Sequence, residues 1–287
     1  MRLAAVGLSE RAVRACFGVR ATVHAPLRAA ALPAPSPLPV PAVPLWLLVA
    51  GHAIDETLAR RALGPLWQPL LELGVIACAD GAARAAVTLL PVGEALLVCL
   101  ARPPGAAGAP DDSSAHLTGA LPPGRRRRWL DVGTGNGYAP LAARGRAAQV
   151  LATDVDEAAL ACARAGALLS GATELAVRRA DLLEGAGTGW DLITFNAPIP
   201  TEPAGDLLAR FWAQAAETIA ADGEVIVHSV LGRDAPRPGR TVVARYTPDG
   251  AEPAFGVTRW QPGAAADERL EIEVPLSARR PHIGALP

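Results

Sequence analysis

A glycine-rich segment near the middle of the chain carries the residues best suited to bind a ligand. It predicts a buried strand that runs into a tight turn, with the sequence Trp129-Leu130-Asp131-Val132-Gly133-Thr134-Gly135-Asn136-Gly137. Glycine has no side chain, so a nucleotide-like ligand can approach the backbone of such a turn closely. The spacing differs from that of a dinucleotide site, which needs glycines at the first, third and sixth positions, because Tyr138 occupies the sixth.

Polar side chains end this strand and the strands that follow it. Asp131 closes the first predicted strand and Asp154 the second, Asp181 follows the third, and Asn196 closes the fourth. Ligands of open α/β sheets bind beyond the carboxyl ends of the strands, where these side chains gather. Asp154 can accept hydrogen bonds from both hydroxyls of a ribose, with Val155 beside it against an adenine face. Asp181 can accept from the adenine amine.

The glycine-rich segment, with its preceding carboxylate, resembles motif I of the class I S-adenosylmethionine (SAM)-dependent methyltransferases. Together with Ala152–Leu160 and Asn196-Ala197-Pro198-Ile199, it extends the resemblance over residues 125 to about 260. The branch is that of the small-domain methyltransferases, which includes glutamine methyltransferases of release factors and nucleobase amine methyltransferases. The resemblance implies a Rossmann-like fold and SAM as cofactor. It implies cofactor contacts from Asp131, Gly133, Gly135, Gly137, Asp154, Val155, Asp181, Leu182 and Asn196.

The acceptor motif departs from that of the family. The family motif is Asn-Pro-Pro followed by Tyr or Phe, which implies that Asn196 and a following backbone carbonyl accept hydrogen bonds from the target amine. Here Ala197 replaces the first proline and Ile199 replaces the aromatic ring. Stacking of a base on an aromatic ring contributes about 1–3 kcal/mol, and an aliphatic side chain cannot replace it. The sequence therefore favours a small, non-planar acceptor.

Two further side chains are candidates for a catalytic role. His228, at the end of the fifth predicted strand, can act as a base on an amine acceptor or can be a partly buried structural histidine. Tyr138 can face the sulfonium through a cation–π contact or can pack at the start of its helix. Both alternatives stay open for each residue.

From Trp129 onward, predicted strands and helices alternate, which indicates a mostly parallel seven-stranded sheet with helices on both faces. The predicted strands are 128–132, 150–153, 175–178, 192–195 and 224–229, with a closing pair at 241–246 and 255–260 and one more candidate at 267–276. The predicted helices are 139–144, 157–169 and 206–220. We expect this SAM-binding Rossmann-like catalytic domain to cover residues 125–287.

The segment before this domain, residues 103–124, is rich in proline, glycine and aspartate and predicts a linker. Within it, Asp111–Ser114 predicts a mobile surface loop. The four arginines of Arg125–Arg128 allow a phosphate site or a solvated start of the first strand.

Residues 1–102 predict a small helical, winged-helix-like N-terminal domain. Short helices before residue 31, a proline-rich connector at 33–41 and helical periodicity over 45–73 precede two predicted strands, 83–90 and 95–100. Residues 63–73 contain no arginine, so a structural or substrate-covering role is favoured over DNA binding.

The amino-acid composition limits which partners and cofactors the chain can be expected to bind. The 27 basic and 28 acidic residues give a net charge of −1, which creates no global field for nucleic acid. The four cysteines lack metal-ligand spacing, so no metal is expected. No signal-peptide core is evident, and the longest apolar run, Leu45–Ala50, is far short of the ~20 residues that cross a membrane. We expect a cytoplasmic protein with no membrane partner, and leave a homodimer open.

Three functions remain open at this stage. The first is a SAM-dependent methyltransferase acting on a small-molecule acceptor, on nitrogen, in specialised metabolism. The second is a SAM-consuming intramolecular cyclase that releases methylthioadenosine, as in azetidine-2-carboxylate synthases. The third is a non-catalytic SAM-binding regulator. All three functions include SAM binding, so they differ only in what happens on the acceptor side of the site.

Overall fold

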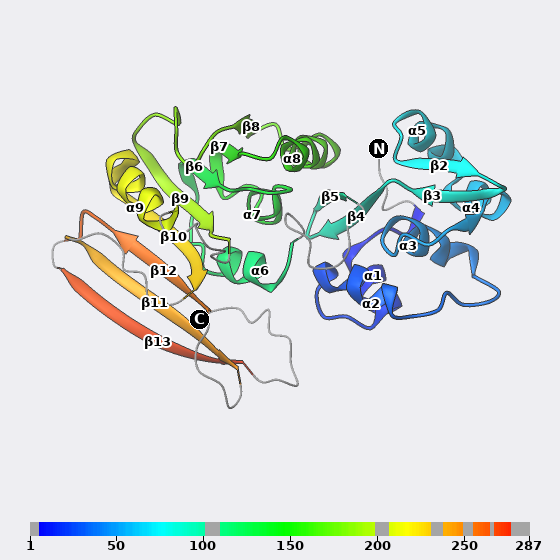
Figure 1. Ribbon diagram of the computed structural model, residues 1–287, viewed down its shortest axis with the longest axis horizontal. Coiled ribbons are helices and arrows are strands. Elements are labelled where there is room, and N and C mark those ends of the chain that lie inside the picture. Colours follow the sequence, from blue (N-terminus) through cyan, green and yellow to red (C-terminus); the bar gives the residue numbers. More distant parts are fainter. Residues whose placement is uncertain are drawn as a thin grey trace.

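The computed structural model describes residues 6–100, 110–198, 207–230, 238–248, 255–264 and 267–276. Figure 1 shows a smaller N-terminal part, in blue and cyan, beside a larger part built on a twisted sheet, in green to red. A hairpin of β4 (Val87–Val92) and β5 (Ala95–Leu100) lies between the two parts.

The sheet of the larger part has eight strands in the order β13-β11-β12-β10-β9-β6-β7-β8. Their bounds are β6 Arg126–Val132, β7 Ala147–Asp154, β8 Leu175–Arg179, β9 Trp190–Asn196, β10 Ile219–Val230, β11 Arg240–Pro248, β12 Phe255–Gln261 and β13 Glu268–Leu276. Strands β6 to β10 are mutually parallel, and β12 runs antiparallel between β10 and β11. The Rossmann-like α/β fold is therefore confirmed. The predicted seven strands become eight because β13 pairs with β11 at the edge.

Helices cover both faces of this sheet. They are α6 Asp112–Gly119, α7 Tyr138–Ala142, α8 Glu157–Ser170 and α9 Leu207–Thr218. Successive residues of a strand point to opposite faces. Accordingly, Trp129 of β6 packs in one apolar cluster with Leu117 of α6 and Ala139 of α7, whereas Leu130 packs in another with Phe211 of α9. The three helices predicted after β6, β7 and β9 are present, although residue 206 lies outside the described residues.

Helix α6 forms within the stretch predicted as a linker, so the prediction of a mobile loop at Asp111–Ser114 is wrong. Asp111 is its N-cap and accepts a hydrogen bond from the backbone nitrogen of Ser113 at 2.9 Å. Aspartate and serine are common in turns, but they also favour helix starts, and only tertiary burial separates the two cases. Here Ala115 and Leu117 are buried beneath the helix. Residues 101–109 of the predicted linker lie outside the described residues.

Three of the four arginines, those that begin β6, have partners within the protein. Arg126 contacts the buried Glu224 at 3.5 Å, and Arg127 contacts Asp191 at 3.5 Å. The guanidinium of Arg128 lies 4.1 Å from the ring centroid of Trp190. These contacts favour a structural start of the strand over a phosphate site.

The N-terminal part begins with short helices, as predicted. Its elements are α1 Glu10–Phe17, η2 Thr22–His24, α2 Ala25–Ala30, η3 Val40–Ala42, α3 Val43–Leu48, β1 Ile54–Asp55, α4 Glu56–Leu63, η4 Gly64–Leu66, α5 Trp67–Glu72, β2 Ile76–Ala79 and β3 Ala82–Ala85, followed by the β4–β5 hairpin. Strands β1, β3 and β2 form a small sheet in that order. The predicted strand at 83–90 is two strands, since β3 pairs with β2 and β4 pairs with β5. The winged-helix-like interpretation stays a prediction.

The β4–β5 hairpin packs tightly on helix α8. Gly166 of α8 faces β5, and a Cβ atom there would lie 2.9 Å from Cδ1 of Leu141 and 3.2 Å from the carbonyl oxygen of Leu96. Four residues along the helix, Ser170 Oγ accepts a hydrogen bond from the backbone nitrogen of Leu96 at 2.9 Å. The missing side chain at Gly166 therefore sets how closely the two parts approach.

We predict that Gly166→Val lowers the free energy of unfolding by about 1–3 kcal/mol, because the added atoms overpack a backbone contact. Urea unfolding measures the change. Leu168→Val is the matched control, since it adds a β-branched residue to the same helix at a position that is 82% exposed. Equal stability losses in the two variants would contradict the close approach.

Candidate functional site

The glycine-rich turn after β6 needs its glycines for backbone geometry. Gly133, Gly135 and Gly137 have φ of 60°, 56° and 80°, in the left-handed region that side chains disfavour. A Cβ atom at Gly133 would lie 3.1 Å from the ring of Phe195, and one at Gly137 would lie 3.3 Å from Cβ of Ala163. The turn is therefore held close to its neighbours.

Asp131 lies beneath this turn with 3% of its surface exposed. Its two carboxylate oxygens accept hydrogen bonds from the hydroxyls of Thr134, at 2.6 Å, and Thr194, at 2.5 Å. Burial raises the pKa of Asp131 to about 6, and the two hydroxyls oppose that rise. The predicted ligand residue is thus placed where it connects β6, the turn and β9.

Asp154 lies beside the turn at the carboxyl end of β7. Its Oδ2 accepts from the backbone nitrogen of Gly135 at 2.8 Å, and its Oδ1 accepts from that of Asp156 at 3.0 Å. A carboxylate oxygen has a second acceptor site, so both oxygens retain capacity. The next side chain, Val155, is 55% exposed at this edge. The structure thus brings together the predicted ribose carboxylate, the predicted adenine platform and the glycine-rich turn.

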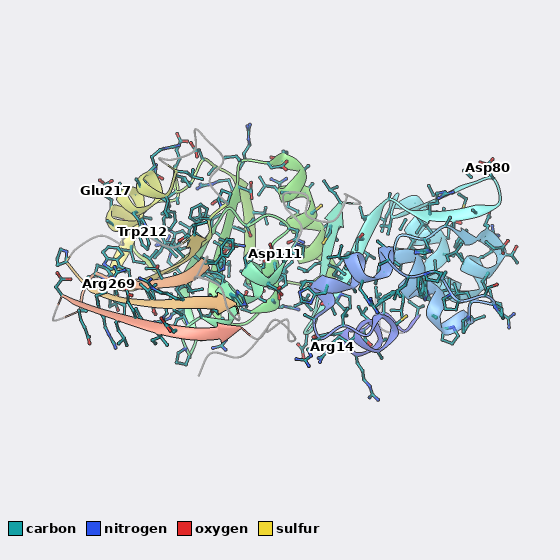
Figure 2. The ribbon with its side chains drawn as sticks, turned by 60° about the horizontal axis from the view of Figure 1, so that its bottom comes forward. Arg14, Asp80, Asp111, Trp212, Glu217 and Arg269 are labelled. Atoms are coloured by element: carbon teal, nitrogen blue, oxygen red, sulfur yellow. The ribbon has the colours of Figure 1, made fainter. Side chains whose placement is uncertain are left out.

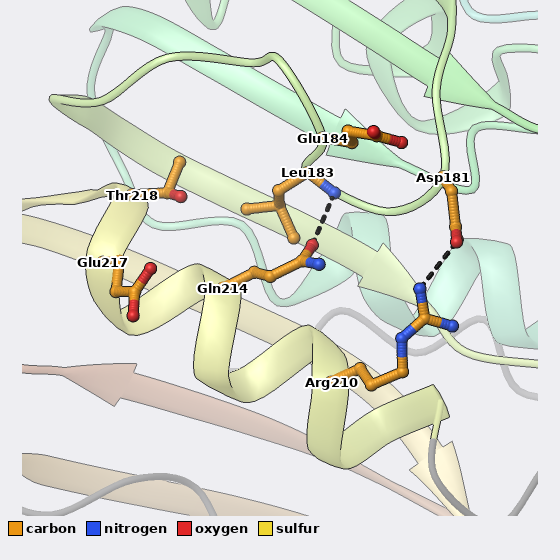
Figure 3. A pocket seen from close by; sticks show the side chains of 7 residues that line it. All are labelled: Asp181, Leu183, Glu184, Arg210, Gln214, Glu217 and Thr218. Atoms are coloured by element: carbon orange, nitrogen blue, oxygen red, sulfur yellow. Dashed lines mark hydrogen bonds and ion pairs between the residues drawn. The ribbon is translucent and has the colours of Figure 1, made fainter.

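Asp181 and Leu182 follow β8. Asp181 is one of the residues that line a cavity of about 530 Å³. Figure 3 shows it with the others, which are Leu183, Glu184, Arg210, Gln214, Glu217 and Thr218. Arg210 of α9 donates to Asp181 at 2.6 Å. Leu182 is buried with a φ of 52°, and its carbonyl oxygen accepts from the hydroxyl of Thr153 at 3.3 Å. An adenine amine at Asp181 would share that carboxylate with Arg210, a partner that sequence reasoning missed.

Asn196 closes β9 on the face that α6 covers. Its Nδ2 donates a hydrogen bond to Ser113 Oγ at 2.7 Å. The neighbouring position in β10 is His228, whose carbonyl oxygen accepts from the backbone nitrogen of Ala197 at 2.9 Å. Pro198 is exposed and Ile199 lies outside the described residues. Sequence reasoning missed Ser113 because it was assigned to a mobile loop.

His228 is 3% exposed within a column of rings. Its ring centroid lies 5.9 Å from that of His116 and 5.9 Å from that of Phe255, and His116 stacks on Tyr246 at 4.1 Å. Burial lowers the pKa of His228 to about 4, and His116 adds to that effect. The imidazole is therefore neutral near pH 7 and a weak base, which favours the structural alternative.

Tyr138 begins α7 and packs against an apolar cluster that runs from the N-terminal part into α7 and α8. Burial, followed by the charges of Glu10 and Asp112, raises the pKa of Tyr138 to about 12, so the phenol stays protonated. This place fits packing at the start of the helix, and the cation–π role stays a prediction. Nearby, His24 of the N-terminal part contacts Asp112 at 2.6 Å, which raises the pKa of His24.

Among the residues that the structure describes, no three His, Cys, Asp or Glu side chains are grouped so that they could hold a metal ion. None of the helices in this described part of the chain is both long enough and apolar enough to cross a membrane.

Residues 105–235 match the family model of the methyltransferase small domain. No curated protein matches the chain. Similar solved structures include a SAM-dependent methyltransferase from Agrobacterium tumefaciens, with 15% identity and a TM-score of 0.46 over 68% of this chain and 79% of that one. They also include the ribosomal protein L11 methylase from Lactobacillus delbrueckii subsp. bulgaricus (22% identity, TM-score 0.39, 52% of this chain and 77% of that one) and the B. subtilis tRNA methyltransferase TrmK (17% identity, TM-score 0.40, 53% and 65%).

The buried imidazole of His228 predicts a pH dependence of stability. Its pKa is lowered on folding, so the unfolded chain binds the proton more tightly and stability is lost as pH falls below about 6.5. We expect this group to cost about 2 kcal/mol between pH 7 and pH 5. Urea unfolding of His228→Gln at both pH values should show a smaller loss than the unsubstituted protein. An equal loss in both proteins would contradict the lowered pKa.

Proposed function

We propose that this chain, whose residues 105–235 match the family model of the methyltransferase small domain, transfers the methyl group of SAM to a nitrogen atom of a small-molecule acceptor. The observation that carries the proposal is the position of Asn196. This neutral amide stands at the carboxyl end of β9, the strand next to β6 and its glycine-rich turn. An amide oxygen there can accept a hydrogen bond from an amine and orient its lone pair.

The donor side fits SAM in three respects. The turn presents backbone without side chains, because all three of its glycines have a positive φ. Asp154 has acceptor capacity for ribose hydroxyls, and Val155 offers an exposed apolar surface beside it. In the proposed arrangement these two residues hold the nucleoside of SAM, and Asp131 positions the turn from below.

The chemistry proposed is an in-line displacement. The bond between the sulfonium and its methyl carbon breaks as the acceptor nitrogen forms a bond to that carbon, and the electron pair returns to sulfur. Positioning contributes most to such a step. The acceptor must arrive as a neutral amine, and the N–H proton leaves to solvent after transfer. Neither His228, with a pKa of about 4, nor Tyr138, with a pKa of about 12, is matched to remove it near pH 7.

The acceptor side supports a small substrate. Helix α6 lies over Asn196, and His24 of the N-terminal part contacts Asp112 of the same helix. We infer that the N-terminal part, which shares an apolar core with α7 and α8, covers the acceptor side of the catalytic domain, with α6 belonging to that domain. A macromolecular acceptor would have to displace this cover.

Mass spectrometry of the products tests the proposed reaction. The purified protein is incubated with SAM alone, and then with pooled amines and amino acids, with bulk tRNA, or with protein extract. We expect S-adenosylhomocysteine only when the small molecules are present. Methylthioadenosine from SAM alone would indicate the cyclase, and product formation only with tRNA or protein would overturn the small acceptor.

Asp154→Ala should weaken SAM binding by about tenfold or more, because hydrogen bonds to a carboxylate are lost. Isothermal titration calorimetry measures the dissociation constant. The control is Asp156→Ala, which removes the N-cap of α8 two residues away and should cost stability without lowering SAM affinity. Unchanged affinity in Asp154→Ala would place the ribose elsewhere.

Asn196→Ala should abolish methyl transfer and leave the affinity for SAM nearly unchanged, since in the proposed arrangement this side chain orients the acceptor while Asp154, Val155 and the glycine-rich turn hold the nucleoside. The assay is S-adenosylhomocysteine formation with an acceptor identified in the product screen. Full activity in this variant would remove Asn196 from the mechanism.

A further inference from the structure

The hydroxyl of Ser113 fixes which way the amide of Asn196 faces. A serine hydroxyl has one hydrogen to donate. Ser113 Oγ donates it to Oδ1 of Asp111, a carboxylate that can only accept. The oxygen of Ser113 can therefore only accept from Asn196, and it receives Nδ2 at 2.7 Å. The reversed amide would place two acceptor oxygens against each other with no hydrogen between them.

We propose that Asp111 and Ser113 are positioning residues that hold the amide of Asn196 so that its Oδ1 faces the acceptor nitrogen. This inference rests on the proposed methyl transfer to nitrogen. With Nδ2 committed to Ser113, the amide presents an oxygen, which attracts an N–H group. A site that presented Nδ2 instead would repel a donor and favour an acceptor oxygen.

The two residues are themselves held in place. Asp111 accepts from the backbone nitrogens of Ser113, at 2.9 Å, and Ser114, at 3.4 Å, so its carboxylate is fixed to the start of α6. Ala115 and Leu117 of that helix are buried, which anchors it to the rest of the protein. Figure 2 shows Asp111 near the middle of the molecule, where its two parts meet, whereas Asp80 lies at the far end of the N-terminal part.

The test uses two probes that need no known acceptor. S-adenosylhomocysteine lacks the methyl group, whereas sinefungin carries a protonated amine where the methyl group of SAM would be. That amine can donate to Oδ1 of Asn196. We expect Ser113→Ala to weaken sinefungin binding about tenfold, the effect of losing one hydrogen bond to a charged group, and to leave S-adenosylhomocysteine binding unchanged.

Two variants complete the experiment, with calorimetry as the readout and thermal unfolding as a check of folding. Ser113→Thr retains the hydroxyl and should restore the preference for sinefungin. Ser114→Ala is the matched control on the next residue of α6 and should keep the preference. An unchanged ratio of the two affinities in Ser113→Ala overturns the positioning role. Failure of the unsubstituted protein to bind S-adenosylhomocysteine would instead overturn the proposed function.

Discussion

The buried carboxylate of Asp131 is the interaction on which the larger part depends. A charge without water is costly unless hydrogen bonds replace the lost hydration, and here the hydroxyls of Thr134 and Thr194 do so. The indole nitrogen of Trp129 in turn donates to the hydroxyl of Thr194 at 2.7 Å. One carboxylate thus links the glycine-rich turn to β9. Asn196 follows Thr194 by two residues on the same face of that strand, so the donor and acceptor sides share one rigid frame.

The acceptor side is assembled from segments that lie far apart in the sequence. Two contacts join these segments through α6. An ion pair connects His24 of the N-terminal part to Asp112, and a hydrogen bond connects Asn196 of β9 to Ser113. The hydrogen bond with Asp112 raises the pKa of His24 and favours its protonated form, whereas the side chains of Ser113 and Asn196 do not titrate near pH 7 and can only orient a reactant. This composition agrees with a reaction that relies on orientation of the two reactants.

The strands, the glycine-rich turn and the polar residues at the strand ends could be predicted because each follows from local pattern. Buried parallel strands are continuous apolar runs, and the positive φ at Gly133, Gly135 and Gly137 requires glycine. Helix α6 could not be predicted, since Asp111 and Ser113 suit a loop as well as a helix start. Strand β2 was missed because Ile76 is its only buried residue. The partner of Asp181, Arg210, comes from another element, and only the folded chain brings the two together.

Three consecutive residues at the start of α6 make three different contacts. Asp111 caps the helix, Asp112 forms an ion pair with His24, and the hydroxyl of Ser113 accepts a hydrogen bond from Asn196. Insertion or deletion of one residue here would rotate the helix by about 100° and misdirect all three side chains at once. Among homologous chains, length changes should therefore concentrate before residue 110 and after residue 119, while this triplet keeps its spacing even where the surrounding sequence drifts.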